Sequence, residues 1–328
     1  MDRVRPSRAR LLLGAIVGLG LLVVTLAQVD IVRTAGLIAV ASPSLLGLAL
    51  AVVLVDLVLR AVRWQVLLRG AGAERGTGLR LPLAYMTVGY LANQLLPARL
   101  GDLARAYLAG QAFAMPRLAA LGTIVVERLA DGSTMLALAL ASTVLVSGIA
   151  VVGYLAVLGV VLAVAALVAL GFGWWLVRRT RLGLLGPARA LTDLVARVAV
   201  GMGGMLTIGG AARVVALTAA VTMTAALLGW LVVAAAGIAL TPLQTVLFVS
   251  AIAMSLAIPA APASIGTYEF VGVLVLTSMG VAAEEALAAV LLLRMISSLP
   301  AALLGIGSVW ALHLRTSQLI QPDRLAAV

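Results

Sequence analysis

Uninterrupted apolar runs of seventeen residues or more recur along this chain of 328 residues, and a run of that length crosses a lipid bilayer as one helix. Hydrophobic residues make up 63% of the sequence, and the mean hydropathy is +1.19. No hydrophilic stretch exceeds about 30 residues, about half of what a small soluble domain needs to bury a core. The sequence therefore predicts an all-α, polytopic membrane protein, with residues 1–328 forming one domain.

Positive charge accompanies the apolar runs. The formal net charge of +11 includes 23 arginines and no lysine, and most of these arginines flank apolar runs. That placement is typical of topology signals that face anionic lipid, and it does not indicate nucleic-acid binding. The chain has no cysteine and one histidine, His313, so thiolate chemistry is excluded. We expect no metal, no cofactor and no nucleic-acid partner.

The first apolar run, about residues 11–29, has two interpretations. It is similar to a signal peptide with a basic start and small residues from Thr25 to Ala27 as the cleavage site. The run is longer than most signal-peptide cores and further membrane segments follow it, which favours an uncleaved first crossing.

Arginine-rich loops give the orientation of the crossings, because cytoplasmic flanks collect arginine. This rule places both termini in the cytoplasm and residues 280–285 outside the cell membrane. An amphipathic segment at about 187–199 is predicted to lie along the cytoplasmic surface, and the glycine-rich stretch 201–210 is interpreted as a bend. About six full crossings are expected, near residues 11–29, 44–68, 118–147, 151–177, 210–237 and 286–312.

Four further apolar pieces are too short to cross a hydrocarbon core of about 30 Å at about 1.5 Å per helical residue. They form two pairs, one joined at Pro97 and the other at Pro262, and each pair is predicted to be a re-entrant hairpin. The pieces are 82–96 with 100–114, and 243–258 with 266–280.

The two hairpins belong to an internal repeat with units near 44–147 and 210–312. The first unit is predicted to start outside the membrane and the second inside, so the repeat is inverted, as in many secondary transporters. At offsets of 165 or 166, PARLG at 97–101 matches PASIG at 262–266, Trp64 matches Trp230, and Arg128 matches Arg294.

Each hairpin restarts a half-helix after a proline, which predicts free backbone N–H groups and a positive dipole end inside the membrane. Two such ends would favour an anion. Charged residues inside a membrane cost at least about 2.5 to 3.5 kcal/mol each, so we expect them to be paired or to line a wet site. The candidate binding residues are Asn93, Pro97, Arg99, Gly101, Asp102, Arg105, Glu127, Arg128, Asp131, Pro262, Gly266, Tyr268, Glu269 and Arg294.

A purely structural interpretation exists for several of these residues. Glu127 and Asp131 would then bond helices together, and Asp56 with Arg60, one helical turn apart, would form an internal ion pair. The side chains of Tyr90, Asn93 and Tyr268 are open to two roles, hydrogen-bond donation and packing. Trp64 and Trp230 are predicted to mark the membrane interface and not to stack on a ligand.

Three segments together carry a family resemblance: NQLLPARLGDLARAYL from residue 93, VVERLAD from residue 125 and PASIGTYE from residue 262. They resemble the membrane region of lysylphosphatidylglycerol synthases and the wider flippase-like family, over about residues 10–315. The resemblance implies a lipid-handling role: translocation of an aminoacylated phospholipid, or a part in polyprenyl- or glycolipid-linked envelope assembly. In the synthases a soluble C-terminal domain transfers the aminoacyl group, and this sequence lacks a match to it, so we expect no synthase activity.

Three functions remain open. The first is a flippase or transporter for an anionic lipid head group, in which Arg99, Arg105 and Arg128 hold phosphate. The second is an integral-membrane transferase or phosphatase acting on a lipid phosphate, which the lack of any recognisable metal or nucleophile motif disfavours, so no catalytic residue is assigned. The third is a non-transporting subunit of an envelope-synthesis complex. Membrane lipids are the expected partners, with a separate lipid-modifying enzyme or glycosyltransferase as a further one.

Overall fold

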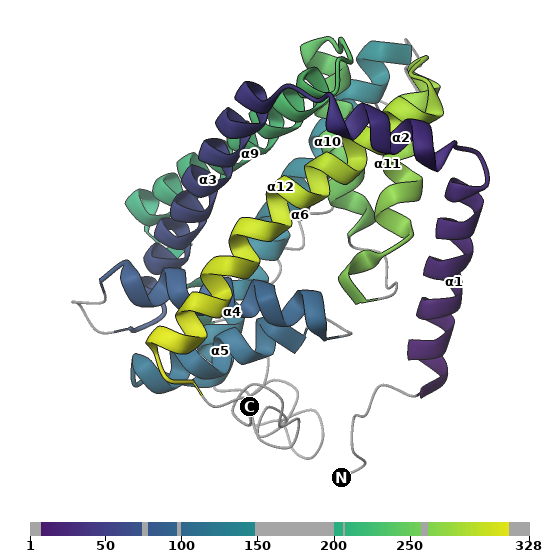
Figure 1. Cartoon of the computed structure of the whole chain (residues 1–328). Coiled ribbons are helices and arrows are strands. Elements are labelled where there is room, and N and C mark those ends of the chain that lie inside the picture. The colour runs from purple at the N-terminus through teal and green to yellow at the C-terminus, as the bar shows by residue number, and fades with distance from the viewer. Residues whose placement is uncertain are drawn as a thin grey trace.

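The computed structural model describes residues 8–73, 78–96, 100–147, 200–205, 207–256 and 262–314, and Figure 1 shows their arrangement. Within these ranges the chain is all-helical, as predicted, with two short 3₁₀ helices, η2 (Val200–Met205) and η3 (Pro262–Ser264). The α-helices are α1 (Arg8–Leu26), α2 (Ile31–Ala39), α3 (Pro43–Gly70), α4 (Arg80–Leu95), α5 (Leu100–Ala112), α6 (Arg117–Ser147), α9 (Ile208–Ala235), α10 (Pro242–Ser255), α11 (Thr267–Ser278) and α12 (Ala283–Ala311).

In the part of the chain that the structure describes, three helices are long and apolar enough to cross a membrane: α3, α9 and α12, of 28, 28 and 29 residues. Helix α6 has 31 residues, but it carries Glu127, Arg128 and Asp131 along its length. The predicted crossing at 151–177 and the surface helix at 187–199 lie outside the described residues. The number of six crossings therefore stays a prediction.

Helix α2 lies between the crossings predicted near residues 11–29 and 44–68, in a stretch for which the sequence analysis names no helix. Asp30 caps the helix: its Oδ1 accepts hydrogen bonds from the backbone N–H groups of Val32 (2.8 Å) and Arg33 (3.1 Å). The segments Gly14–Leu26 and Ile31–Ala39 would count as one apolar span, but they are bent by 83°. In Figure 1, α2 runs across the top of the molecule while α1 stands at its side.

Both hairpins are made of short helices, as predicted. Helices α4 and α5 have 16 and 13 residues, and α10 and α11 have 14 and 12. The backbone explains the second break, because Ala263, Ser264 and Gly266 all adopt positive φ angles of 56°, 55° and 89°. A helix cannot continue through such residues, so α11 has to start afresh at Thr267.

The order long, short, short, long occurs twice, in α3 to α6 and again in α9 to α12. Each unit packs against the other in an equivalent way. The first short helix of each unit packs against the last long helix of the other, α4 on α12 and α10 on α6, and the two first long helices, α3 and α9, pack against each other. Within each unit, α5 contacts α4 and α6, and α11 contacts α10 and α12. Each of these contacts in one unit therefore has a counterpart in the other, and the hairpins lie toward opposite ends of the bundle in Figure 1.

Each unit supplies most of one apolar core. The first core contains Trp64, Met86 and Ile124, and the second contains Phe248 and Leu276. Small residues allow close contact between helices from different units: a Cβ atom on Gly305 of α12 would lie 2.7 Å from the backbone oxygen of Thr87 in α4. This packing fixes the hairpins between the long helices, where the charged side chains lie.

Candidate functional site

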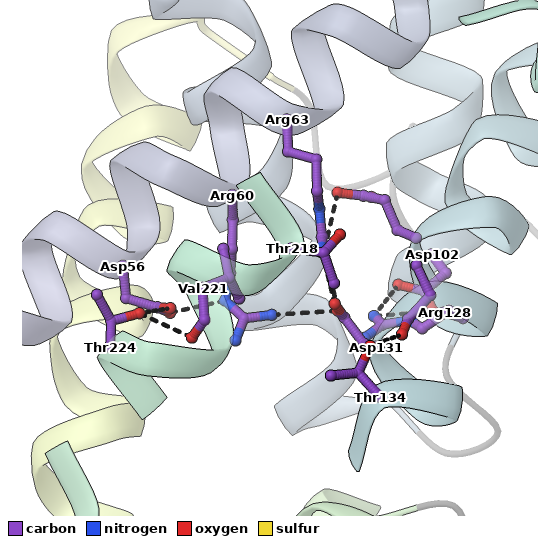
Figure 2. A network of polar contacts seen from close by, with 12 residues as sticks. Asp56, Arg60, Arg63, Asp102, Arg128, Asp131, Thr134, Thr218, Val221 and Thr224 are labelled. Atoms are coloured by element: carbon purple, nitrogen blue, oxygen red, sulfur yellow. Dashed lines mark hydrogen bonds and ion pairs between the residues drawn. The ribbon is translucent and has the colours of Figure 1, made fainter. Parts of the chain in front are cut away.

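Asp131 of α6 is the centre of a polar network that joins α6 to α3 (Figure 2). Its carboxylate accepts hydrogen bonds from Arg63 at 2.5 Å (Nη1) and 2.9 Å (Nη2), and from Arg60 Nη1 at 3.4 Å. A two-point contact between guanidinium and carboxylate fixes the relative position of both side chains. Asp131 therefore cross-links the two long helices, the structural role that the sequence left open for it.

Asp56 and Arg63 of α3 form hydrogen bonds with α9. Arg60 Nε donates to Asp56 Oδ2 at 2.6 Å, which confirms the predicted internal ion pair. Thr224 Oγ1 donates to Asp56 Oδ1 at 2.8 Å, and Arg63 Nη1 donates to Thr218 Oγ1 at 3.1 Å. Helix α9 thus contributes two neutral hydroxyl groups to a network whose charges come from α3 and α6 (Figure 2).

Arg105 of α5 lies at the buried end of this network. Its Nη2 donates to Glu127 Oε2 at 2.7 Å, and its guanidinium carbon lies 3.6 Å from the centre of the Trp64 ring. Trp64 is fully buried and its Nε1 donates to Thr123 Oγ1 at 2.9 Å, so its predicted place at the membrane interface is wrong. With its side chain only 2% exposed, Arg105 is enclosed by the protein and is poorly placed to meet a ligand.

Arg128 is more exposed than Arg60, Arg63 and Arg105, the arginines of the network around Asp131. Its side chain is 38% exposed, and its Nη2 donates to Asp102 Oδ1 at 2.9 Å. Asn93 holds the same carboxylate, because its Nδ2 donates to Asp102 Oδ1 at 3.1 Å. The Oδ1 atom of Asn93 accepts from the backbone N–H of Gly101 at 2.9 Å. Asn93 therefore fixes both the start of α5 and the acid that faces Arg128.

The second hairpin carries an equivalent pair. Arg294 of α12 donates to Glu269 Oε1 through Nη1 and to the backbone oxygen of Ala263 through Nη2. Glu269 Oε2 accepts from the backbone N–H of Gly266 at 2.7 Å. The guanidinium carbon of Arg294 lies 4.8 Å from the centre of the Tyr268 ring. Asp102 and Glu269 are each the third residue of their helix, and each pairs with an arginine of the long helix that follows.

These contacts correct the expectation of free N–H groups at the half-helix starts. The N–H of Gly101 is bonded to Asn93 and that of Gly266 is bonded to Glu269. A carboxylate in the first turn also balances the positive end of the helix dipole in α5 and in α11. In this state the protein supplies its own anion at both positions.

The structure brings most of the predicted site residues into three groups. One is the buried network with Arg105, Glu127 and Asp131, and the others are the two exposed pairs with their neighbours. Two half-helix starts at one anion site would place Arg99 and Glu269 in one cavity near the membrane midplane. Pro97 and Arg99 lie outside the described residues, so this arrangement stays a prediction. The second hairpin does reach the first, because η3, which begins at Pro262, contacts α4.

Sequence reasoning missed Arg63, Thr218 and Thr224 as parts of this network. The signal for Arg63 was its spacing from Arg60 and Asp56, since residues three, four or seven apart share one helix face. The two threonines gave no signal, because a hydroxyl on an apolar helix normally bonds to its own backbone.

A comparison with protein-family models finds one that matches residues 11–305, and it is described as the lysylphosphatidylglycerol synthase TM region. None of the curated proteins matches the chain. The matched family and the apolar helices indicate a multi-pass membrane protein of lipid or envelope metabolism.

Proposed function

The chain belongs to the lysylphosphatidylglycerol synthase TM region family, and on that premise we propose that it binds the anionic head group of a membrane lipid and moves it across the bilayer. The lipid classes in view are aminoacyl-phospholipids, polyprenyl phosphates and glycolipids. The observation that carries the proposal is the double occurrence of an arginine–carboxylate pair, Asp102 with Arg128 and Glu269 with Arg294, at corresponding places in two similar units.

The arrangement of helices supports transport. Two units with the same order of helices exchange their packing partners, since α4 packs on α12 and α10 packs on α6. Inverted repeats with broken helices near the membrane midplane are a recurrent plan of secondary transporters. In the proposed topology the repeats are inverted, both termini are cytoplasmic and residues 280–285 are external, because every arginine-rich loop then lies inside.

The chemistry of the exposed pairs supports an anionic ligand. Arginine binds phosphate through two parallel N–H groups, which a lysine cannot do. Arg128 and Arg294 have side chains 38% and 20% exposed, so we assign the phosphate to them and, as an untested third group, to Arg99. Glu127 already occupies the buried Arg105, and we assign that pair to holding α5 against α6.

A liposome assay tests the proposal. The purified protein is reconstituted with fluorescent phosphatidylglycerol, and dithionite added outside bleaches only the outer leaflet. We expect the protein to expose nearly all of the label, and Arg128→Gln to slow exposure by at least about tenfold, because loss of one charge-assisted contact is worth about 1.5 to 3 kcal/mol. Arg33→Gln, on exposed α2, is the matched control and should leave the rate unchanged.

Two other results would reject the proposed transport, and a third would reject the assignment of Arg128. Equal rates for the protein and for empty liposomes would favour a non-transporting subunit of an envelope complex. A chemically altered lipid, detected by mass spectrometry, would favour a lipid-phosphate transferase. Full activity of Arg128→Gln would remove this residue from the phosphate site.

A further inference from the structure

In both hairpins a carboxylate of the protein occupies the donors that an incoming phosphate needs. Glu269 accepts from the guanidinium of Arg294 and, through Oε2, from the N–H of Gly266 at 2.7 Å. Asp102 accepts from Arg128 Nη2 at 2.9 Å and from Asn93 Nδ2 at 3.1 Å. A guanidinium together with an amide N–H is a donor set suited to the oxygens of a phosphate.

Exposure separates the arginines of these two pairs from Arg63 and Arg105 of the charged network, although not from Arg60, whose side chain is 21% exposed. The side chains of Arg63 and Arg105 are only 1% and 2% exposed, so a lipid head group cannot reach them without opening the helix bundle. Arg128 and Arg294 are far more open, at 38% and 20%. Asp102 and Glu269 are less exposed than the arginines that they face, at 15% and 5%.

The free-energy cost of an unpaired arginine inside a membrane explains why each of these two arginines has a carboxylate beside it. An unpaired arginine there costs at least about 2.5 to 3.5 kcal/mol, so each arginine needs an anion whenever no lipid is bound. A bound phosphate would place a second negative charge on the same donors, and like charges at contact repel. We infer that Asp102 and Glu269 are built-in anions, which lipid phosphate displaces when it binds to Arg128 and Arg294; this inference rests on the proposed function.

Displacement of Glu269 would also loosen the tip of the second hairpin. Glu269 holds the N–H of Gly266, and Arg294 holds the backbone oxygen of Ala263. Both of these residues have positive φ angles, 89° for Gly266 and 56° for Ala263, the second of which is uncommon for a residue other than glycine. Exchange of one anion for another therefore couples binding to the backbone of the hairpin.

Neutral variants of the carboxylates test the inference. Glu269→Gln and Asp102→Asn keep the shape of the side chain and remove the charge that phosphate has to displace. The full chain in detergent is titrated with dioctanoyl phosphatidylglycerol in a calorimeter. We expect each variant to bind about tenfold more tightly than the native protein, within the range of coupling between contacting groups. Glu284→Gln, in the first turn of α12, is the matched control and should bind like the native protein.

The outcomes separate this inference from the proposed function. If Arg128→Gln and Arg294→Gln abolish binding but Glu269→Gln and Asp102→Asn bind no more tightly than the native protein, displacement is wrong and the proposed function stands. If the native protein and all of these variants bind dioctanoyl phosphatidylglycerol equally, or not at all, both are wrong. Thermal unfolding of each variant shows that it is folded, and because the two carboxylates lie on different hairpins, either variant alone suffices for the test.

Discussion

The two helical units, α3 to α6 and α9 to α12, both carry an arginine–carboxylate pair at the hairpin, but they differ in their other charged residues. Each has an arginine–carboxylate pair at the start of its second hairpin helix, and the arginine of each pair is partly exposed. Among the described residues, only the first unit has a network of further ion pairs, in which Arg60 is 21% exposed and Arg63 and Arg105 are buried. At an offset of 166 these three residues correspond to Ala226, Gly229 and Val271, which carry no charge.

This difference separates two roles for charge in one membrane protein. What both units share is accessible and lies where the two hairpins turn, so it fits the handling of a ligand. What only the first of the described units has is a set of ion pairs between helices α3, α5 and α6, with Arg63, Arg105 and Glu127 enclosed by the protein, so it fits cohesion. Four substitutions test the packing and the ion pairs, and they are given in order of decreasing expected loss of stability: one at Glu127, two at hairpin glycines and one at Thr224.

Glu127→Ala should have the largest effect. It leaves the guanidinium of Arg105 without its only carboxylate partner among the described residues, 2.7 Å away, and it also removes the 3.6 Å contact with Arg63. Breaking a buried ion pair in this way costs about 3 to 5 kcal/mol. Equilibrium unfolding in mixed micelles measures the loss. A change below about 1 kcal/mol would show that the network does not hold the helices together.

Alanine at the two hairpin glycines should have an intermediate effect. A Cβ atom would lie 2.0 Å from the backbone oxygen of Gly89 if added to Gly101, and 1.8 Å from that of Gly18 if added to Gly266. We expect Gly101→Ala to cost about 1 to 3 kcal/mol by overpacking. Gly266→Ala should cost about 1 kcal/mol more, because Gly266 also has a positive φ of 89°.

Gly132→Ala is the control for both glycines, since nothing lies within 4 Å of its added Cβ atom. It should stabilise the protein by about 0.5 to 1 kcal/mol through helix propensity alone. Equal unfolding midpoints for all three variants would contradict the packing described for the hairpin starts.

Thr224→Val should have the smallest effect. It removes one hydrogen bond, at 2.8 Å, to Asp56, which keeps its contact with Arg60. One hydrogen bond to a charged group contributes about 1.5 to 3 kcal/mol, and valine restores part of this by better apolar burial, so we expect a loss of about 1 kcal/mol in the same unfolding measurement. A loss as large as that of Glu127→Ala would show that the hydrogen bond from α9 stabilises the protein as much as the ion pairs of α6 do.

The sequence predicted the helices and the hairpins because their causes are local. A run of apolar residues defines a long helix, and the prolines at 97 and 262 mark the places where the short ones break. Helix α2 was not predicted because its nine residues are too few to be recognised as a membrane crossing. Its signal in the sequence was Asp30, a residue type that often caps the start of a helix.

The partners of the charged residues could not be predicted in the same way. Asp131 bonds to Arg63, which lies 68 residues earlier, and only the packing of α3 against α6 brings the two together. Trp64 shows the same limit, since an indole ring suits a membrane interface and a buried cation equally well. The sequence thus indicated which charged residues to examine, and their role in a binding site stays a prediction, whereas their partners and the enclosure of Arg63 and Arg105 required the fold.

The central claim is that lipid phosphate binds at the two arginine–carboxylate pairs, Asp102 with Arg128 and Glu269 with Arg294. A cryo-electron microscopy map of the protein in nanodiscs containing phosphatidylglycerol tests it most directly. The account predicts head-group phosphate within about 3.5 Å of a guanidinium nitrogen of Arg128 or Arg294, with Asp102 or Glu269 turned away from it. Lipid found only around the outer surfaces of α3, α9 and α12, with both ion pairs unchanged, would contradict the account.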